Sequence, residues 1–169
     1  GKSVRTVESI VRLNEKQKSK KKGNSMNKQQ QMQEILKDTV DYYAEDPVNR
    51  RSIDKDGNCN YTWGNTHCAV GRYLKPEYQR ENWIENNMSV NELMDGSDDG
   101  CNIDWCLRDD AKGLDVDFWI VLQDFHDSHS CWITEDDYNK DEEPIGLSLV
   151  GKEKYRTIES KINMGNYDG

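Results

Sequence analysis

The clearest core helix in this chain is predicted for Asp115-Val116-Asp117-Phe118-Trp119-Ile120-Val121-Leu122-Gln123-Asp124-Phe125-His126-Asp127. Asp115 is a suitable N-cap, since its short carboxylate can accept a hydrogen bond from a free amide of the first turn. The apolar side chains recur at intervals of three and four residues, which puts them on one helical face: Phe118, Val121, Leu122 and Phe125, with Trp119 beside them. The stretch therefore predicts a helix that organises a hydrophobic core.

Two further amphipathic helices are predicted on either side of it. One spans about residues 28–45 and should end before Pro47, because proline cannot continue a helical hydrogen-bond ladder. The other spans Val150 to Met164. Their apolar stripes consist of Met32, Ile35, Leu36, Val40 and Tyr43 in the first helix, and of Tyr155, Ile158 and Ile162 in the second.

The segment between these helices is richer in turn signals. Asp56-Gly57 and Gly64-Asn65 flank Cys59–Trp63, which predicts a short hairpin or an extended loop near residues 52–63. Thr66 is a candidate cap for a short helix through Leu74, and residues 89–92 carry the Ser-x-x-Glu pattern of a capping box. The fold class is mainly α, in one compact helical domain, with a small α+β arrangement as the alternative.

Another short helix is expected to begin at Pro76, which suits a first helical turn. Its inward-facing side chains would be Tyr78, Trp83 and Ile84.

Composition restricts the classes of protein. The chain has 169 residues, 33% charged and 34% hydrophobic, with no apolar run of about 20 residues and no signal-peptide block at its start. We expect a cytoplasmic protein with no membrane partner. Five cysteines are an odd number, so reduced thiols are expected rather than a disulfide framework.

Charge is divided sharply along the chain. Residues 1–28 carry a formal charge of +7, which leaves −16 on the remainder, and the window 92–143 alone carries −14. Such an acidic body repels nucleic acid and favours a partner with a basic surface. The carboxylates predicted to bind that partner are Asp98, Asp99, Asp109, Asp110, Asp136 and Asp137, with Trp105 as an aromatic anchor.

The basic start is predicted to be separate from the acidic domain at 26–169. Residues 3–16 fit an amphipathic helix, followed by a linker with a basic cluster of Lys18, Lys20, Lys21 and Lys22. Residues 1–25 suit an authentic extension, a fusion or a tag. Any contact with nucleic acid would come from this segment.

A cysteine-dependent enzyme is one alternative function. Cys68 in the first turn of its predicted helix would gain thiolate character from the helix dipole. His126 and Asp127 would then supply the general base and the orienting carboxylate.

A structural zinc ion is the cofactor to consider if the protein holds one. Zinc needs four nitrogen or sulfur ligands around one point. The candidates are Cys59, His67, Cys68, His126, His129 and Cys131, without a paired Cys-x-x-Cys motif among them.

One combination of motifs resembles a known group of proteins. It comprises Cys59-Asn60-Tyr61, Cys68-Ala69-Val70-Gly71-Arg72-Tyr73-Leu74, Pro76-Glu77-Tyr78 and Leu122-Gln123-Asp124-Phe125-His126-Asp127, with Trp132 after them. The pattern resembles a group of small uncharacterised bacteriophage and prophage proteins over about residues 50–132. Arg72-Tyr73 and the acidic stretch 95–117 depart from the group's form.

The resemblance implies a compact domain in which the cysteines and the His-Asp pair support the architecture, and it brings no established activity. Together with the acidic window it predicts an accessory protein that binds and inhibits or modulates a host or defence protein by mimicking nucleic-acid charge. A Cys-His-Asp hydrolase or transferase, and a nucleic-acid-binding accessory protein that uses the basic segment, are the alternatives.

Overall fold

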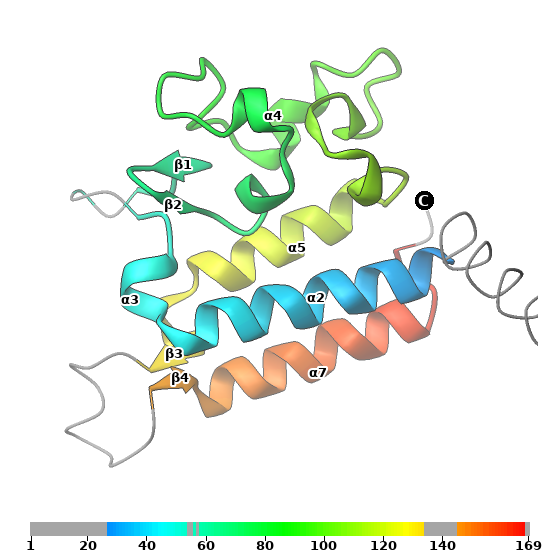
Figure 1. The fold of residues 1–169 in the computed structure, drawn as a ribbon. Coiled ribbons are helices and arrows are strands. Elements are labelled where there is room, and N and C mark those ends of the chain that lie inside the picture. Colours follow the sequence, from blue (N-terminus) through cyan, green and yellow to red (C-terminus); the bar gives the residue numbers. More distant parts are fainter. Residues whose placement is uncertain (1–26, 54–55, 57, 134–144, 168–169) are drawn as a thin grey trace, which may run out of the picture.

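Three long helices form the base of the molecule in the computed structural model, which describes residues 27–53, 56, 58–133 and 145–167. They are α2 (Lys28–Glu45), α5 (Val116–Asp127) and α7 (Leu149–Asn163). All three pack on one another, with α7 running opposite to α2 and α5 (Figure 1). The mainly α fold class and the three predicted helices are confirmed.

Polar caps set the beginning of each of these helices. The Asn27 side chain accepts a hydrogen bond from the Gln30 amide at 2.8 Å, and that of Asp115 accepts one from the Asp117 amide at 2.9 Å. The Ser148 hydroxyl accepts from the Gly151 amide at 3.0 Å. Each cap satisfies an amide that the helix cannot pair internally.

Pro47 ends α2 as predicted and begins the short helix α3 (Pro47–Arg50). The same end of the molecule carries a two-stranded antiparallel sheet, in which the strands β3 (Trp132–Ile133) and β4 (Gly146–Leu147) have two residues each. Gly151 of α7 faces the Cys131 carbonyl so closely that a Cβ would clash with it. A glycine is therefore needed where α7 crosses the strand region.

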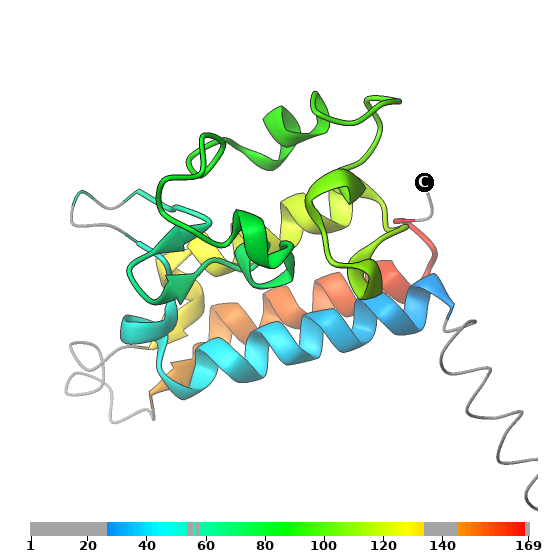
Figure 2. The ribbon, with the colours of Figure 1, turned by 45° about the horizontal axis from the view of Figure 1, so that its top comes forward.

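The described residues between Arg51 and Asp115 lie on the side of α5 and α2 away from α7 (Figures 1 and 2). Its hairpin pairs β1 (Thr62–Trp63) with β2 (Thr66–His67), so the hairpin turns at Gly64-Asn65. An isolated antiparallel bridge joins Ile53 to Cys59. The predicted hairpin is present, with its strands slightly later than expected.

The prediction of a helix from Thr66 to Leu74 is wrong. The chain enters strand β2 at Thr66 and later forms one 3-10 turn, η1 (Gly71–Tyr73). The Cys68 amide donates to the Tyr61 carbonyl at 3.2 Å, and a Cβ on Gly71 would collide with that same carbonyl. This backbone contact outweighs the local helical propensity of the segment.

A second departure concerns residues 76–84, where a 3-10 turn, η2 (Pro76–Tyr78), replaces the predicted helix. Trp83 is buried as expected, whereas Ile84 is 84% exposed. Trp83 packs between the rings of Tyr78 and Tyr61, with Trp105 also in contact. Aromatic packing rather than a helical stripe holds this segment.

The remaining short elements are α4 (Val90–Met94), η3 (Asp104–Cys106), η4 (Asp109–Ala111) and η5 (His129–Cys131). The predicted capping box at the start of α4 is confirmed, with both Ser89 and Glu92 hydrogen bonds present.

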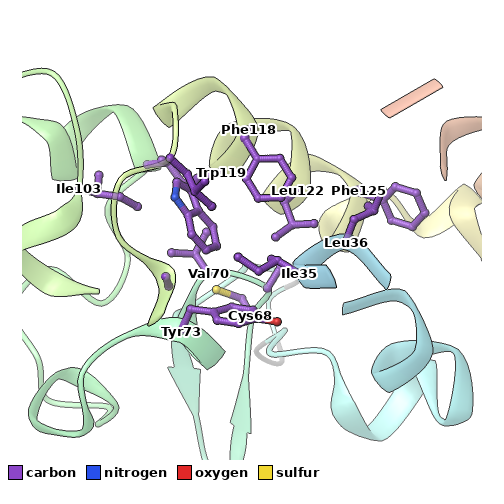
Figure 3. Packing of buried hydrophobic residues seen from close by; sticks show 14 of the residues in the cluster. Ile35, Leu36, Cys68, Val70, Tyr73, Ile103, Phe118, Trp119, Leu122 and Phe125 are labelled. Atoms are coloured by element: carbon purple, nitrogen blue, oxygen red, sulfur yellow. The ribbon is translucent and has the colours of Figure 1, made fainter. Parts of the chain in front are cut away.

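The core lies where α5 packs against α2 and against the segment between Arg51 and Asp115. Figure 3 shows Phe118, Trp119 and Leu122 of α5 close to Ile35 of α2 and Val70 of the η1 region. Trp119 and Trp132 are among the largest fully buried side chains. Tryptophans thus supply much of the buried area in a chain with few aliphatic residues.

Several predictions concern residues outside the described ranges. They are the helix at 3–16, the basic cluster Lys18, Lys20, Lys21 and Lys22, and the carboxylates Asp136 and Asp137.

Candidate functional site

The end of α5 is fixed by a buried arginine. The Arg51 Nε donates to the His126 carbonyl at 2.8 Å, and a terminal guanidinium nitrogen donates to the Asp127 carbonyl at 3.1 Å. These carbonyls lie in the last turn, where the helix offers them no amide partner. Arg51 therefore holds the backbone of His126 and Asp127 in one position.

The Asp127 carboxylate is the centre of a group of side chains at this helix end. Its Oδ1 atom lies 2.6 Å from His126 Nδ1 and accepts a hydrogen bond from the Cys59 thiol at 2.7 Å. The ligand atoms of Cys59, His126 and Asp127 all lie within 4.8 Å of one another. The Cys59 thiol thus meets an imidazole and a carboxylate that lie 67 and 68 positions later in the sequence.

Gln123 joins this group to the η1 region. Its Nε2 donates to Asp127 Oδ1 at 3.0 Å, while its Oε1 accepts from the Val70 amide at 3.2 Å. The side chain therefore spans from the Cys68–Gly71 segment to the end of α5. Three of the sequence segments that carry the resemblance, those with Cys59, Val70 and Gln123, converge here.

A polar pocket of about 360 Å³ opens over this group. Cys59, Gln123 and Asp127 line it together with Cys68. The lining also includes amide, hydroxyl and carboxylate side chains around the start of α4, namely Asn86, Asn87, Ser89, Asn91 and Glu92. Such a lining suits a polar ligand or an ion.

The protonation states at this site follow from burial and from neighbouring charge. Burial, and then the Asp127 carboxylate, raise the pKa of the Cys59 thiol well above its usual value. His126 has no exposed surface, and burial lowers the pKa of its imidazole despite the nearby Asp127. Both Cys59 and His126 are therefore neutral at pH 7.

Cys68 does not have the surroundings predicted for a nucleophile. It lies between a strand and a 3-10 turn rather than at a helix start, and its side chain points into the core beside Val70 and Tyr73 (Figure 3). Burial raises the pKa of the Cys68 thiol to about 12. The thiol that contacts Asp127 is Cys59, and the carboxylate lies between that thiol and the imidazole, unlike the predicted order of nucleophile, base and orienter.

The six predicted zinc ligands are only partly brought together. Within the described ranges, Cys59 and His126 form a potential ligand group with Asp127, a carboxylate outside the predicted set. His67 Nδ1 is instead 2.9 Å from the Thr62 hydroxyl, Cys131 is buried at the end of η5, and His129 is exposed at the start of η5.

The second candidate region is the acidic cap, which we define as residues 76–115. It contains eleven acidic and three basic side chains, a formal charge of −8. Asp98, Asp99, Asp109 and Asp110 are all exposed, as expected for a binding surface. Asp109 pairs with Lys112 at 3.0 Å and Asp110 with Arg108 at 3.2 Å, while Asp99 accepts hydrogen bonds within its own loop.

Trp105, which is predicted to anchor a partner, is partly buried and packs within this cap. Its indole nitrogen donates to the Leu93 carbonyl at 2.9 Å, and its ring contacts Tyr78 and Trp83. The most exposed tryptophan among the described residues is Trp63, at 42%.

Sequence reasoning did not identify Arg51, Gln123 or Asn86 as site residues. Gln123 was part of the quoted motif, four positions before Asp127 on the same helical face, and that spacing could have indicated the contact. Arg51 and Asn86 act on backbone groups far away in the sequence, for which no local pattern exists.

Searches of protein-family models, curated proteins and solved structures find no match to this chain. None of the helices in the described ranges combines the length and apolar character that a membrane-spanning segment requires.

Proposed function

We propose that this protein is an acidic accessory protein that binds the basic surface of a macromolecular partner through its acidic cap. The observation that carries the proposal is the separation of charge in space. The acidic cap has a formal charge of −8, whereas α2 and α7 together carry six acidic and six basic side chains and are neutral.

The carboxylates of the cap are suited to an intermolecular role because they cost little to rearrange. Asp98, Asp109 and Asp110 are exposed, and the ion pairs of Asp109 and Asp110 span only two or three positions on the surface. Exposed pairs of this kind contribute about 0–1 kcal/mol each. A basic partner can replace Lys112 and Arg108 at small cost.

The nature of the partner follows from the same charge. A dense array of carboxylates presents negative charge to a groove that evolved for phosphates, and complementary potentials accelerate association. The resemblance to small bacteriophage and prophage proteins favours a host or defence protein with a nucleic-acid-binding surface. Occupation of that surface would inhibit or modulate the partner.

The test is capture from a bacterial lysate on the immobilised full chain, with the retained proteins identified by mass spectrometry. We expect a basic nucleic-acid-binding protein to be retained at about 0.1 M salt and released at about 0.5 M salt, because screening shortens the range of the attraction. An added DNA duplex should release the same protein, since the duplex and the cap compete for one surface.

A charge-matched pair of variants separates the cap from net charge. The cap variant combines Asp95→Asn, Asp98→Asn, Asp109→Asn and Asp110→Asn; the control combines Glu34→Gln, Asp41→Asn, Glu45→Gln and Glu153→Gln on α2 and α7. Each set contains two ion-paired carboxylates. The cap variant should bind the captured protein about tenfold or more weakly, and the control about as tightly as wild type. Equal loss in both variants, or no such protein at either salt, would contradict the proposal.

A further inference from the structure

We propose that Cys59, His126 and Asp127 form a binding site for a borderline-soft divalent cation of the zinc class, with a further coordination position open to the polar pocket. This inference is independent of the acidic cap and of its partner. It rests on one sulfur, one nitrogen and one oxygen donor that lie within 4.8 Å of one another.

The donor set matches the chemistry of zinc. Thiolate, imidazole and carboxylate are its three usual protein ligands, at about 2.0–2.3 Å from the ion. Tetrahedral geometry then requires ligand atoms roughly 3.3–3.5 Å apart. The present separations from Asp127 Oδ1 are 2.7 Å to the Cys59 sulfur and 2.6 Å to the His126 nitrogen. The carboxylate has to move by roughly 0.8 Å.

Proton balance favours an ion over a nucleophile at this point. Metal binding releases the Cys59 proton to solvent and leaves a thiolate beside the Asp127 carboxylate, two negative charges that a dication compensates. If Nδ1 is the ligand, its proton moves to Nε2 of the same ring. Nε2 is buried and has no hydrogen-bond partner among the described residues, so the arriving proton displaces no contact at that nitrogen. The Nδ1 hydrogen bond to Asp127 is lost and is replaced by ligation of both groups to the ion.

The surroundings of the three donors hold them in place. Gln123 Nε2 orients the Asp127 carboxylate from 3.0 Å, as outer-shell partners of metal ligands do. Arg51 is positively charged, but its donors are directed at the main-chain oxygens of His126 and Asp127 rather than at the carboxylate. It fixes the backbone that carries two of the three ligands.

Access to the site is one-sided. Cys59 and Asp127 line the pocket, whereas His126 is fully buried behind them. An ion held by three protein ligands would thus expose its remaining position to a cavity of about 360 Å³. Three protein ligands with an open position are typical of catalytic rather than structural zinc. The ligand class that this predicts for the pocket is water or a small molecule with an oxygen or other anionic donor.

Cobalt titration of the purified, reduced full chain tests the site, because thiolate ligation of Co²⁺ produces a near-ultraviolet charge-transfer band. We expect about one equivalent of Co²⁺ per chain with this band, and displacement by Zn²⁺. Cys59→Ser should remove the band. Cys101→Ser, which changes an exposed thiol distant in the sequence, should leave it unchanged. Gln123→Ala should weaken binding by about 10-fold, the effect of losing an outer-shell partner.

The proposal is overturned if wild type binds no cobalt, or if the charge-transfer band persists in Cys59→Ser. Circular dichroism establishes whether Cys59→Ser is folded. If it is not, Asp127→Asn decides the question, and unchanged cobalt affinity in that variant overturns the site. A chain that binds cobalt as expected but captures no basic protein would support this site and contradict only the acidic-cap proposal.

Discussion

Helices α2, α5 and α7 bury apolar side chains along regular stripes, whereas the acidic cap contains one α-helix of five residues and several 3-10 turns. Apart from their ends, the helices satisfy their backbone hydrogen-bonding groups internally. The cap depends on side chains that bond to the main chain of distant segments, as Trp105 does to Leu93. Adjacent in space, the two regions thus obtain their order from different interactions.

The difference explains where the candidate metal site lies. His126 and Asp127 belong to a regular helix, whose end is a rigid platform, while Cys59 comes from the irregular region before the hairpin. Sites that combine a rigid element with a loop are common because the loop can supply chemistry without disturbing the core. We therefore expect substitutions in the long helices to reduce the free energy of unfolding most. Substitutions in the region of the acidic cap should have a smaller effect, and a substitution at the exposed N-cap residue of the short helix α3 should have the smallest.

The largest effect is expected from Leu36→Ala in α2. Leu36 is fully buried in the core cluster, and its truncation leaves a cavity that the packed side chains around it cannot close. We expect a loss of about 3 kcal/mol in the free energy of unfolding. Urea denaturation followed by circular dichroism measures it.

The matched control is Leu149→Ala in α7, where the same side chain is 65% exposed. Its effect should stay within about 0.5 kcal/mol. Similar losses in the two variants would show that the stripe of α2 is not the main source of stability.

The helices were predictable because their information is local. Met32, Ile35, Leu36 and Val40 repeat with the helical period, and Pro47 and Ser89 mark boundaries within a few residues of the groups they affect. These elements were predicted with nearly correct bounds.

The prediction failed where distant groups override local preference. Thr66–Leu74 has helical character, yet the contact of Gly71 with the Tyr61 carbonyl and the bond from Val70 to Gln123 impose another conformation. The same conformation removes Cys68 from the start of the predicted helix. Only the fold shows that Cys59 is the thiol next to Asp127.

Asn86→Ala is expected to have an intermediate effect. The buried Asn86 side chain accepts from the Thr62 amide at 2.8 Å and donates to the carbonyls of Thr62 and Glu81 at 3.0 and 3.2 Å. It acts as a substitute for a neighbouring strand. Alanine leaves these backbone groups without their partner, which should cost about 2 kcal/mol.

Asn87→Ala is the control, since the neighbouring amide is exposed and should contribute little to stability. Both variants are compared by urea denaturation with tryptophan fluorescence, to which Trp83 beside this segment contributes. A negligible effect of Asn86→Ala would mean that the aromatic cluster alone orders the region.

The smallest effect, and one that depends on pH, is expected from Asp46→Asn at the start of α3. Asp46 accepts hydrogen bonds from the Asn49 side chain at 2.9 Å and from the Asn49 amide at 3.1 Å, and these bonds lower the pKa of its carboxyl group. A carboxyl whose pKa is lower in the folded than in the unfolded chain stabilises the fold above its unfolded pKa of about 3.9, and this contribution disappears as the pH falls through the folded value. Asparagine keeps a capping oxygen but does not titrate. The helix α3 has only four residues and the site is exposed to solvent. The free energy of unfolding of wild type should therefore exceed that of the variant by only about 0.3 kcal/mol at pH 6, and the difference should vanish at about pH 3.

Urea midpoints at both pH values, with Asp98→Asn as the control for loss of one exposed charge, measure this difference. A gap that is the same at both pH values would show that Asp46 acts through shape alone, and that the boundary between α2 and α3 does not depend on charge.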